Sequence, residues 1–168
     1  MNTYYLEMKS PGGLIPSRPV ADLELREVNP PDGRVNQRFY KEVGGPWKWT
    51  YCAEWSADRW NQYLRRHLIS TVILERAGEE IGYSELISRG GNIEILSFGL
   101  TPPYIGQGLG SASLEAILRF AWNLPEAHRV WLHTCDNDHP NALNNYQRRG
   151  FVLYATRHTD EQSNPSRD

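Results

Sequence analysis

The strongest constraint on the fold is a glycine-rich junction between a predicted strand and a predicted helix. Residues 92–100 are largely apolar and predict a strand, and residues 107–123 repeat apolar side chains at helical spacing. Three alternating glycines lie at this junction: Gly106, Gly108 and Gly110. Because glycine has no Cβ, the backbone there can adopt positive φ and approach a ligand closely.

The first N–H groups of the helix that follows have no partner within the helix, and they lie at the positive end of its dipole. A glycine-rich turn in front of such a helix is typical of a phosphate or pyrophosphate site.

Strand and helix patterns along the rest of the chain predict a mixed sheet. Strands are expected at 4–8, 22–28, 70–76, 80–88, 129–134 and 151–156, and helices at 34–43, after Ser56 and at 141–149. The helix at 107–123 connects the strands at 92–100 and 129–134, and such a crossover predicts that these two strands are parallel. The earlier strands are joined by tight turns and are expected to be antiparallel. The expected fold class is α/β (α+β mixed), with a mostly antiparallel sheet of about six to seven strands and helices on both faces.

The length of 168 residues predicts a single domain over residues 1–159, and the polar end, 160–168, is expected to be disordered. The net charge of -2 and the absence of long Lys/Arg blocks argue against nucleic-acid binding. No apolar run is long enough for a membrane span. Cys52 and Cys135 form no CxxC pair, so a disulfide framework is excluded and a reducing cytoplasm is the expected location.

Two common phosphate loops do not fit. A nucleotide P-loop requires a Lys, which is missing from Gly110-Ser111-Ala112. A dinucleotide fingerprint requires a third glycine where this chain has Ser111 or Ser113, depending on the first glycine counted.

A third family fits. The segment 100–112, Leu-Thr-Pro-Pro-Tyr-Ile-Gly-Gln-Gly-Leu-Gly-Ser-Ala, resembles the acyl-CoA loop of the GNAT acetyltransferase superfamily. Residues 142–151 resemble a second block of that superfamily, Ala-x-x-x-Tyr-x-x-x-Gly-Phe, in the same order and spacing. Two positions depart from the pattern: Ile105 stands where Arg or Gln is usual, and His139 where Asn is frequent. Asn137 or Asn141 could take over that polar role.

This resemblance implies a GNAT-like acyl-CoA N-acyltransferase fold, with acetyl-CoA as co-substrate. It implies main-chain contacts from Phe98 and Leu100 to the pantetheine arm, and an N–H donor for the carbonyl oxygen near Leu100. The expected coenzyme-binding residues are Phe98, Leu100, Ile105, Gly106, Gln107, Gly108, Leu109, Gly110 and Ser111.

Tyr146 matches the family tyrosine that points at the CoA sulfur, and the resemblance therefore makes it the candidate acid for the leaving thiolate. A tyrosine at this position could instead cap the core, with its hydroxyl bonded to a backbone group.

Glu94 is the candidate base. Strict alternation along 92–100 would place Glu94, Leu96, Phe98 and Leu100 on one face of the strand. Ile93-Glu94-Ile95 also resembles the strand that carries the base in histone-type members, although an ordinary ion pair would equally explain the carboxylate. Glu85 on the neighbouring strand is the alternate, acting through a water chain at the substrate side.

The region 46–63 is rich in aromatic residues, and the resemblance places the substrate wall here. Trp47, Trp49 and Tyr51 would share one face if extended, and they form either a pocket for the amine by cation–π contact or part of the core. Trp60 and Tyr63 are expected in the core. His133, Cys135 and His139 lack a fourth ligand nearby, so no metal site is expected.

The sequence therefore predicts an N-acetyltransferase that moves an acetyl group from acetyl-CoA to a primary amine by direct attack, through a tetrahedral intermediate. The alternative is a non-catalytic acyl-CoA-binding sensor or regulatory module. A homodimer is compatible with the resemblance, since family members are often dimers.

Overall fold

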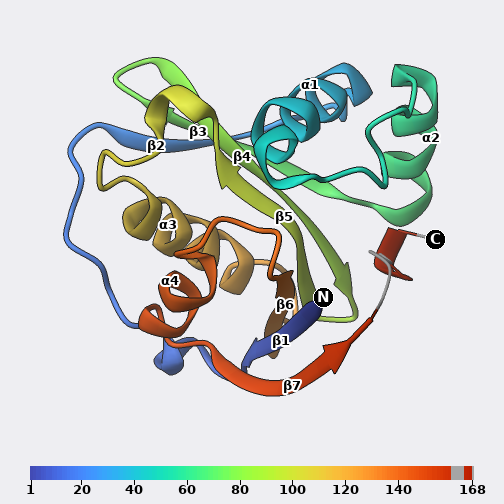
Figure 1. Cartoon of the computed structure of the whole chain (residues 1–168). Helices are drawn as coiled ribbons and strands as arrows, with labels where there is room; N and C mark the ends of the chain where they lie inside the picture. Colours follow the sequence, from blue (N-terminus) through green and yellow to red (C-terminus); the bar gives the residue numbers. More distant parts are fainter. Residues whose placement is uncertain (160–164, 168) are drawn as a thin grey trace.

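A seven-stranded mixed sheet forms the centre of the molecule in the computed structural model, which describes residues 1–159 and 165–167 (Figure 1). The strand order is β2-β3-β4-β5-β6-β1-β7. The strands are β1 (Asn2–Met8), β2 (Leu23–Glu27), β3 (Ser70–Arg76), β4 (Glu79–Arg89), β5 (Asn92–Leu100), β6 (Arg129–Cys135) and β7 (Val152–His158). The helices are α1 (Gly33–Gly44), α2 (Ala57–His67), α3 (Gly110–Trp122) and α4 (Ala142–Arg148).

The predicted mixed sheet is confirmed. β5 and β6, which α3 connects, are parallel, and the other neighbouring strands are antiparallel. The β3–β4 turn contains Gly78 with φ +81°, as expected of a tight turn.

Helices cover both faces of the sheet (Figure 1). α1 and α2 lie on one face, over an aromatic core that includes Phe39, Trp60 and Tyr83. α3 lies on the other, over an aliphatic core that includes Leu114 and Ile117. Ser56 caps α2 as predicted, because its hydroxyl accepts a hydrogen bond from the Arg59 N–H at 3.1 Å.

The central strands β5 and β6 diverge after a short stretch of pairing. They pair only from Asn92–Glu94 to Arg129–Trp131, so the second half of β5 separates from β6. Beyond this point, the edge of β5 that faces β6 and the edge of β6 that faces β5 are not paired with each other. The gap between the two strands leaves room for a ligand inside the sheet.

The predicted alternation along β5 is wrong because the strand contains a bulge. Glu85 pairs with Ser97 while Leu86 pairs with Ile95, which leaves Leu96 without a partner position. The extra residue shifts the side-chain alternation. Leu96 therefore contacts the aromatic core under α2, and so does Ile87, which pairs with Glu94 across the strands. Phe98 and Leu100 pack on the opposite face of the sheet, with α3.

The N-terminal strand β1 lies inside the sheet rather than at its edge. It pairs with β6 on one side and β7 on the other, and its Leu6 is fully buried. The sequence predicts this strand but not its place.

One predicted helix boundary and one predicted backbone conformation differ in the structure. α3 begins at Gly110 rather than at 107, since Gly108 has φ +73°, which is incompatible with a right-handed helix. Trp47, Trp49 and Tyr51 are not extended, because a 3-10 turn (Gly45–Trp47) leads into Lys48 with φ 59°.

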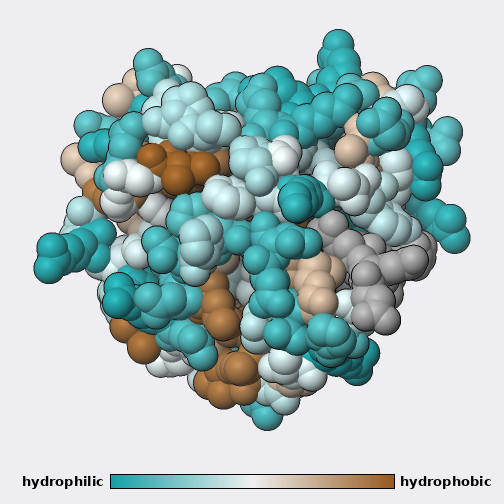
Figure 2. Space-filling model, in the orientation of Figure 1, coloured by the Kyte–Doolittle hydropathy of each residue, from teal (hydrophilic) through white to brown (hydrophobic). Residues whose placement is uncertain are grey.

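Most of the tail that is expected to be disordered lies outside the described residues. The exception is Pro165–Arg167, a 3-10 turn whose Arg167 side chain is buried. None of the helices described is long and apolar enough to cross a bilayer. The face shown in Figure 2 is mostly hydrophilic, and its apolar residues form small separate patches.

Candidate functional site

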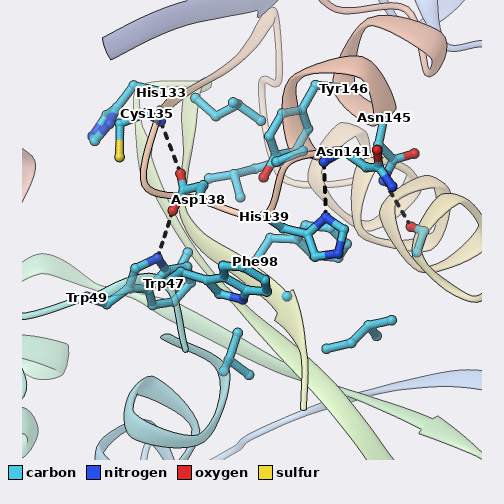
Figure 3. Close-up of a pocket in the computed structure, with 18 of the residues that line it drawn as sticks. Trp47, Trp49, Phe98, His133, Cys135, Asp138, His139, Asn141, Asn145 and Tyr146 are labelled. Carbon is cyan, nitrogen blue, oxygen red and sulfur yellow. Dashed lines mark hydrogen bonds between the residues drawn. The ribbon is translucent and has the colours of Figure 1, made fainter. Parts of the chain in front are cut away.

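A cavity of about 650 Å³ lies where β5 and β6 diverge. Its wall includes the second half of β5, the glycine loop with the start of α3, the end of β6, α4, and the aromatic segment that follows α1 (Figure 3). The motifs that the sequence singled out separately therefore meet in one space.

The glycine loop forms one end of this cavity. Gly106 and Gly108 have φ +80° and +73°, and a Cβ at either position would meet open space. Within the described residues, the backbone N–H groups of 106–112 donate to no protein acceptor. These amides, at the positive end of a 13-residue helix, are suited to bind the oxygens of a pyrophosphate.

Most of the expected coenzyme-binding residues line the cavity: Phe98, Leu100, Ile105, Gly106, Gly108, Leu109, Gly110 and Ser111. Gln107 does not, because its side-chain amide turns back and donates to the Pro103 carbonyl at 2.7 Å. The sequence analysis missed Asn145 of α4, whose Oδ1 accepts from the Ser111 hydroxyl at 3.0 Å and ties α4 to the loop.

Tyr146 projects from α4 into the cavity (Figure 3). Its ring packs edge-on against Phe98 and Phe151, at centroid distances of 6.5 and 5.9 Å. Burial, and to a smaller extent the charge of Asp138, raises the pKa of its hydroxyl above the usual 10. No protein acceptor among the described residues engages this hydroxyl, so the backbone bond of the core-capping alternative is not formed. A protonated phenol is therefore held at the cavity wall.

Aromatic residues form a further wall of the cavity. Trp47, Trp49 and Tyr51 all line it, although they do so from a turn rather than from a strand. Trp47 packs against His139 at a ring distance of 4.9 Å.

Asp138, a residue that the sequence analysis did not identify, fixes this wall to β6. Its Oδ1 accepts from the Trp49 indole N–H at 2.9 Å (Figure 3), and its Oδ2 accepts from the Thr134 hydroxyl at 2.6 Å. Of the two residues expected to take over the polar role of the family asparagine, Asn141 lines the cavity and Asn137 does not.

The two candidate bases do not line the cavity. Glu94 is 1% exposed and lies 3.5 Å from an Arg89 guanidinium nitrogen; burial raises the pKa of its carboxyl, and contacts with Ser166, Arg89 and Arg167 only partly oppose this. Glu85 is fully buried. Burial raises its pKa too, but the Arg167 guanidinium and hydrogen bonds from Ser97 and Tyr83 outweigh burial and hold that pKa below its usual range.

Arg167 is the side chain that separates Glu85 from the cavity, which Arg167 itself lines. No sequence pattern indicates this, because the residue lies in a polar tail remote from every motif. His133 and Cys135 share one face of β6 and line the cavity. Among the described residues, no group of His, Cys, Asp or Glu side chains is arranged to hold a metal ion.

The geometry agrees with a comparison with known families. Residues 36–151 match the sequence profile described as the Acetyltransferase (GNAT) family. The chain belongs to the GNAT family. That span includes both candidate motifs, and GNAT proteins use acetyl-CoA, which fits the unpaired amides at the start of α3.

Solved GNAT structures share the fold. A GCN5-related N-acetyltransferase from Kribbella flavida superposes with a TM-score of 0.66 at 17% identity, over 93% of this chain and 56% of that one. Spermidine N-acetyltransferase from Vibrio cholerae, in complex with CoA and spermine, gives 0.66 at 21% identity, over 81% and 84%. The ribosomal-protein-S18-alanine N-acetyltransferase from Escherichia coli gives 0.60 at 16% identity, over 79% of each chain.

This GNAT chain spans about half the length of several of the structures that it matches. The comparison with curated proteins gives no match.

Proposed function

We propose that this GNAT protein is an N-acetyltransferase that moves an acetyl group from acetyl-CoA to a primary amine. The observation that supports this most directly is one continuous cavity, which joins the unpaired amides of the glycine loop to Tyr146 and to the aromatic wall. Donor and acceptor bound at its two ends would meet beside the Tyr146 hydroxyl.

The glycine loop binds the pyrophosphate in this proposal, through the N–H groups of residues 106–112. The pantetheine arm lies along the edge of β5 that β6 leaves open, with main-chain contacts from Phe98 and Leu100. An N–H near Leu100 stabilises the charge that develops on the carbonyl oxygen.

The amine nitrogen attacks the thioester carbonyl carbon, and the C–S bond then breaks. Tyr146 donates its proton to the departing thiolate. In water this transfer is uphill by about 1.5 pKa units, or roughly 2 kcal/mol, because a thiol has a pKa of about 8.5 and a phenol about 10. The Tyr146 hydroxyl therefore protonates the sulfur as negative charge develops on it and the C–S bond breaks. The raised pKa of Tyr146 keeps this proton in place at neutral pH before the reaction.

The amine must lose a proton before or during the attack. We assign this to Glu94, because burial raises the pKa of its carboxyl and makes it a stronger base than an exposed carboxylate, with Glu85 acting through a water chain as the alternate. Neither carboxylate lines the cavity itself, and Glu85 lies behind Arg167, which does.

The structural neighbours indicate the class of acceptor. Two structural neighbours act on spermidine and on a ribosomal protein alanine, respectively, so a small amine and a peptide N-terminus are both compatible with the fold. Trp47, Trp49 and Tyr51 would contact the acceptor.

Turnover tests the proposal against the alternative of a non-catalytic sensor. Acetyl-CoA is incubated with a panel of amines, and release of free thiol is followed while calorimetry measures acetyl-CoA binding. Amine-dependent thiol release supports the enzyme, and tight binding without release across the panel supports the sensor. If acetyl-CoA produces neither heat nor a shift in melting temperature, both functions are wrong.

A further inference from the structure

The Arg167 side chain occupies a buried anionic site at the acceptor end of the cavity. Its two terminal nitrogens donate to the two Glu85 oxygens, each at 3.1 Å. Both side chains are almost completely buried, with exposed fractions of 1% and 0%. A bidentate pair of this kind recognises a planar cation with defined geometry.

Three aromatic rings surround the same guanidinium. Its carbon lies 5.5 Å from the centroid of Tyr40, 5.4 Å from Trp60 and 5.8 Å from Tyr63. These distances are within the range of cation–π attraction, which strengthens when the cation is desolvated. Trp60 and Tyr63, which the sequence assigned to the core, thus also form a cage for a cation together with Tyr40.

The carboxylate is held in place independently of Arg167. Glu85 Oε1 also accepts from the Tyr83 hydroxyl and the Ser97 hydroxyl, both at 2.7 Å. These partners belong to the paired strands β4 and β5. The anion and its cage are therefore part of the sheet and its helices, whereas the cation comes from the chain terminus.

The terminal turn has few other attachments to the described structure. The Ser166 carbonyl oxygen accepts a hydrogen bond from the Tyr63 hydroxyl at 3.5 Å, and Ser166 also contacts the Glu94 carboxyl. The Arg167 side chain therefore makes the main contact, and it lies between Glu85 and the cavity. A free cation of similar shape would meet the same carboxylate and the same rings.

We propose that the Glu85 site binds a positively charged group of the acceptor, and that Arg167 of this chain occupies that site as an intramolecular competitor. The acceptor is then a primary amine that carries a second cationic group, such as a guanidinium or an ammonium. This rests on the proposed function, because it names the substrate class of that cavity.

The charge of the acceptor follows from the burial of Glu85. An acceptor that displaces Arg167 without bringing a positive charge would leave a carboxylate uncompensated in an apolar surrounding, which is strongly unfavourable. Since the tail competes within the same molecule, it lowers the fraction of binding-competent protein and raises the apparent dissociation constant of the acceptor.

The first experiment tests the cation site without catalysis. In the full-length Arg167→Ala variant, N-propylguanidinium should raise the melting temperature in a saturable manner, and the neutral isostere N-propylurea should not. The Glu85→Gln/Arg167→Ala double variant should lose this response, because the anion is gone. Equal shifts with both compounds would overturn the proposal.

The second experiment tests the acceptor class by kinetics. Agmatine carries a primary amine and a guanidinium, and n-pentylamine carries the amine alone. Arg167→Ala should lower the KM for agmatine on the order of tenfold, while the KM for acetyl-CoA and for n-pentylamine stays within about twofold. The control is Arg157→Ala, since Arg157 is exposed and its guanidinium makes a comparable cation–π contact with the Tyr5 ring, at 5.2 Å. An unchanged agmatine KM in Arg167→Ala would overturn the proposal.

The two experiments separate this inference from the proposed function. A guanidinium-specific rescue in a protein that acetylates no amine supports the cation site while the N-acetyltransferase assignment fails. Should Arg167→Ala not fold, Arg167→Lys keeps the charge but loses the two-pronged contact. Arg167→Lys should lower the agmatine KM by a smaller factor than is expected for Arg167→Ala. An unchanged agmatine KM in Arg167→Lys would again overturn the proposal.

Discussion

At the scale of single residues, burial decides the chemistry that each group can perform. Tyr146 and Glu94 are both buried polar side chains, and burial raises the pKa of each. A raised pKa keeps the phenol protonated as an acid, and it moves the carboxyl toward the range in which a base works at neutral pH. Glu85 is buried as well, yet its partners reverse the direction of the shift.

Replacing Tyr146 by Phe removes the proton donor while keeping the ring contacts with Phe98 and Phe151. We expect kcat to fall by about 10²-fold or more, and the acetyl-CoA dissociation constant to change by less than about twofold. Steady-state kinetics and calorimetry measure the two quantities. Tyr154→Phe on the exposed edge strand is the control and should leave both unchanged; a normal kcat in Tyr146→Phe would remove Tyr146 as the acid.

Stability should depend on pH through Glu94 with a predictable sign. Because its pKa is raised in the folded state, the folded protein binds more protons than the unfolded chain above the ordinary pKa of 4.5. Stability from this group therefore falls as pH rises through 4.5 to the raised value. The stability of Glu94→Gln relative to wild type should increase between pH 4 and 7, measured by thermal unfolding.

Glu7→Gln supplies a control of opposite sign. Burial tends to raise the pKa of Glu7, but its ion pair with Arg129 at 2.7 Å outweighs burial and lowers that pKa. The contribution of Glu7 is present above the unfolded pKa and is lost as pH falls through the lowered value, so Glu7→Gln should lose relative stability as pH rises. Parallel trends in the two variants would contradict the assigned shifts.

At the scale of elements, α3 and the glycine loop form one unit. The helix cannot begin before Gly110, because Gly106 and Gly108 have positive φ, and this late start leaves a run of free amides at the cavity. α4 is joined to the same unit through Asn145, so the phosphate end and Tyr146 are held together.

Gly108→Trp should abolish acetyl-CoA binding, because the indole would fill the space in front of the amides. Gly78→Trp is the matched control: Gly78 also has positive φ and open space around a Cβ, but it lies in the β3–β4 turn. Each variant should lose about 1–2 kcal/mol of stability from backbone strain. Calorimetry should find acetyl-CoA binding in Gly78→Trp alone; binding in Gly108→Trp would place the phosphates elsewhere.

At the scale of the whole molecule, the first strand and the Pro165–Arg167 turn both contribute to the cavity wall. β1 fills the position between β6 and β7, and Met1 and Thr3 line the cavity. Arg167 lines the same cavity. Segments far apart in the sequence therefore share one cavity wall.

Leu6→Ala tests the structural role of β1. Leu6 is fully buried and pairs with Leu132 on one side and Leu153 on the other, so its truncation should cost about 2–5 kcal/mol in the free energy of unfolding. Leu25→Ala on the edge strand β2, where the side chain is half-buried, should cost less than half as much. Urea unfolding measures both; similar losses would argue that β1 is not integral to the core.

Local pattern alone determined the strands, the helices, the parallel crossover and the glycine loop. Each of these depends on side-chain periodicity or on the backbone freedom of residues such as Gly108. Both properties can be read from residues that are close together in the sequence. Tertiary structure alone decided the bulge at Leu96, the insertion of β1 and the burial of Arg167 against Glu85. These features arise from pairings between segments far apart in the chain, and no periodicity within one segment encodes the partner that it will meet.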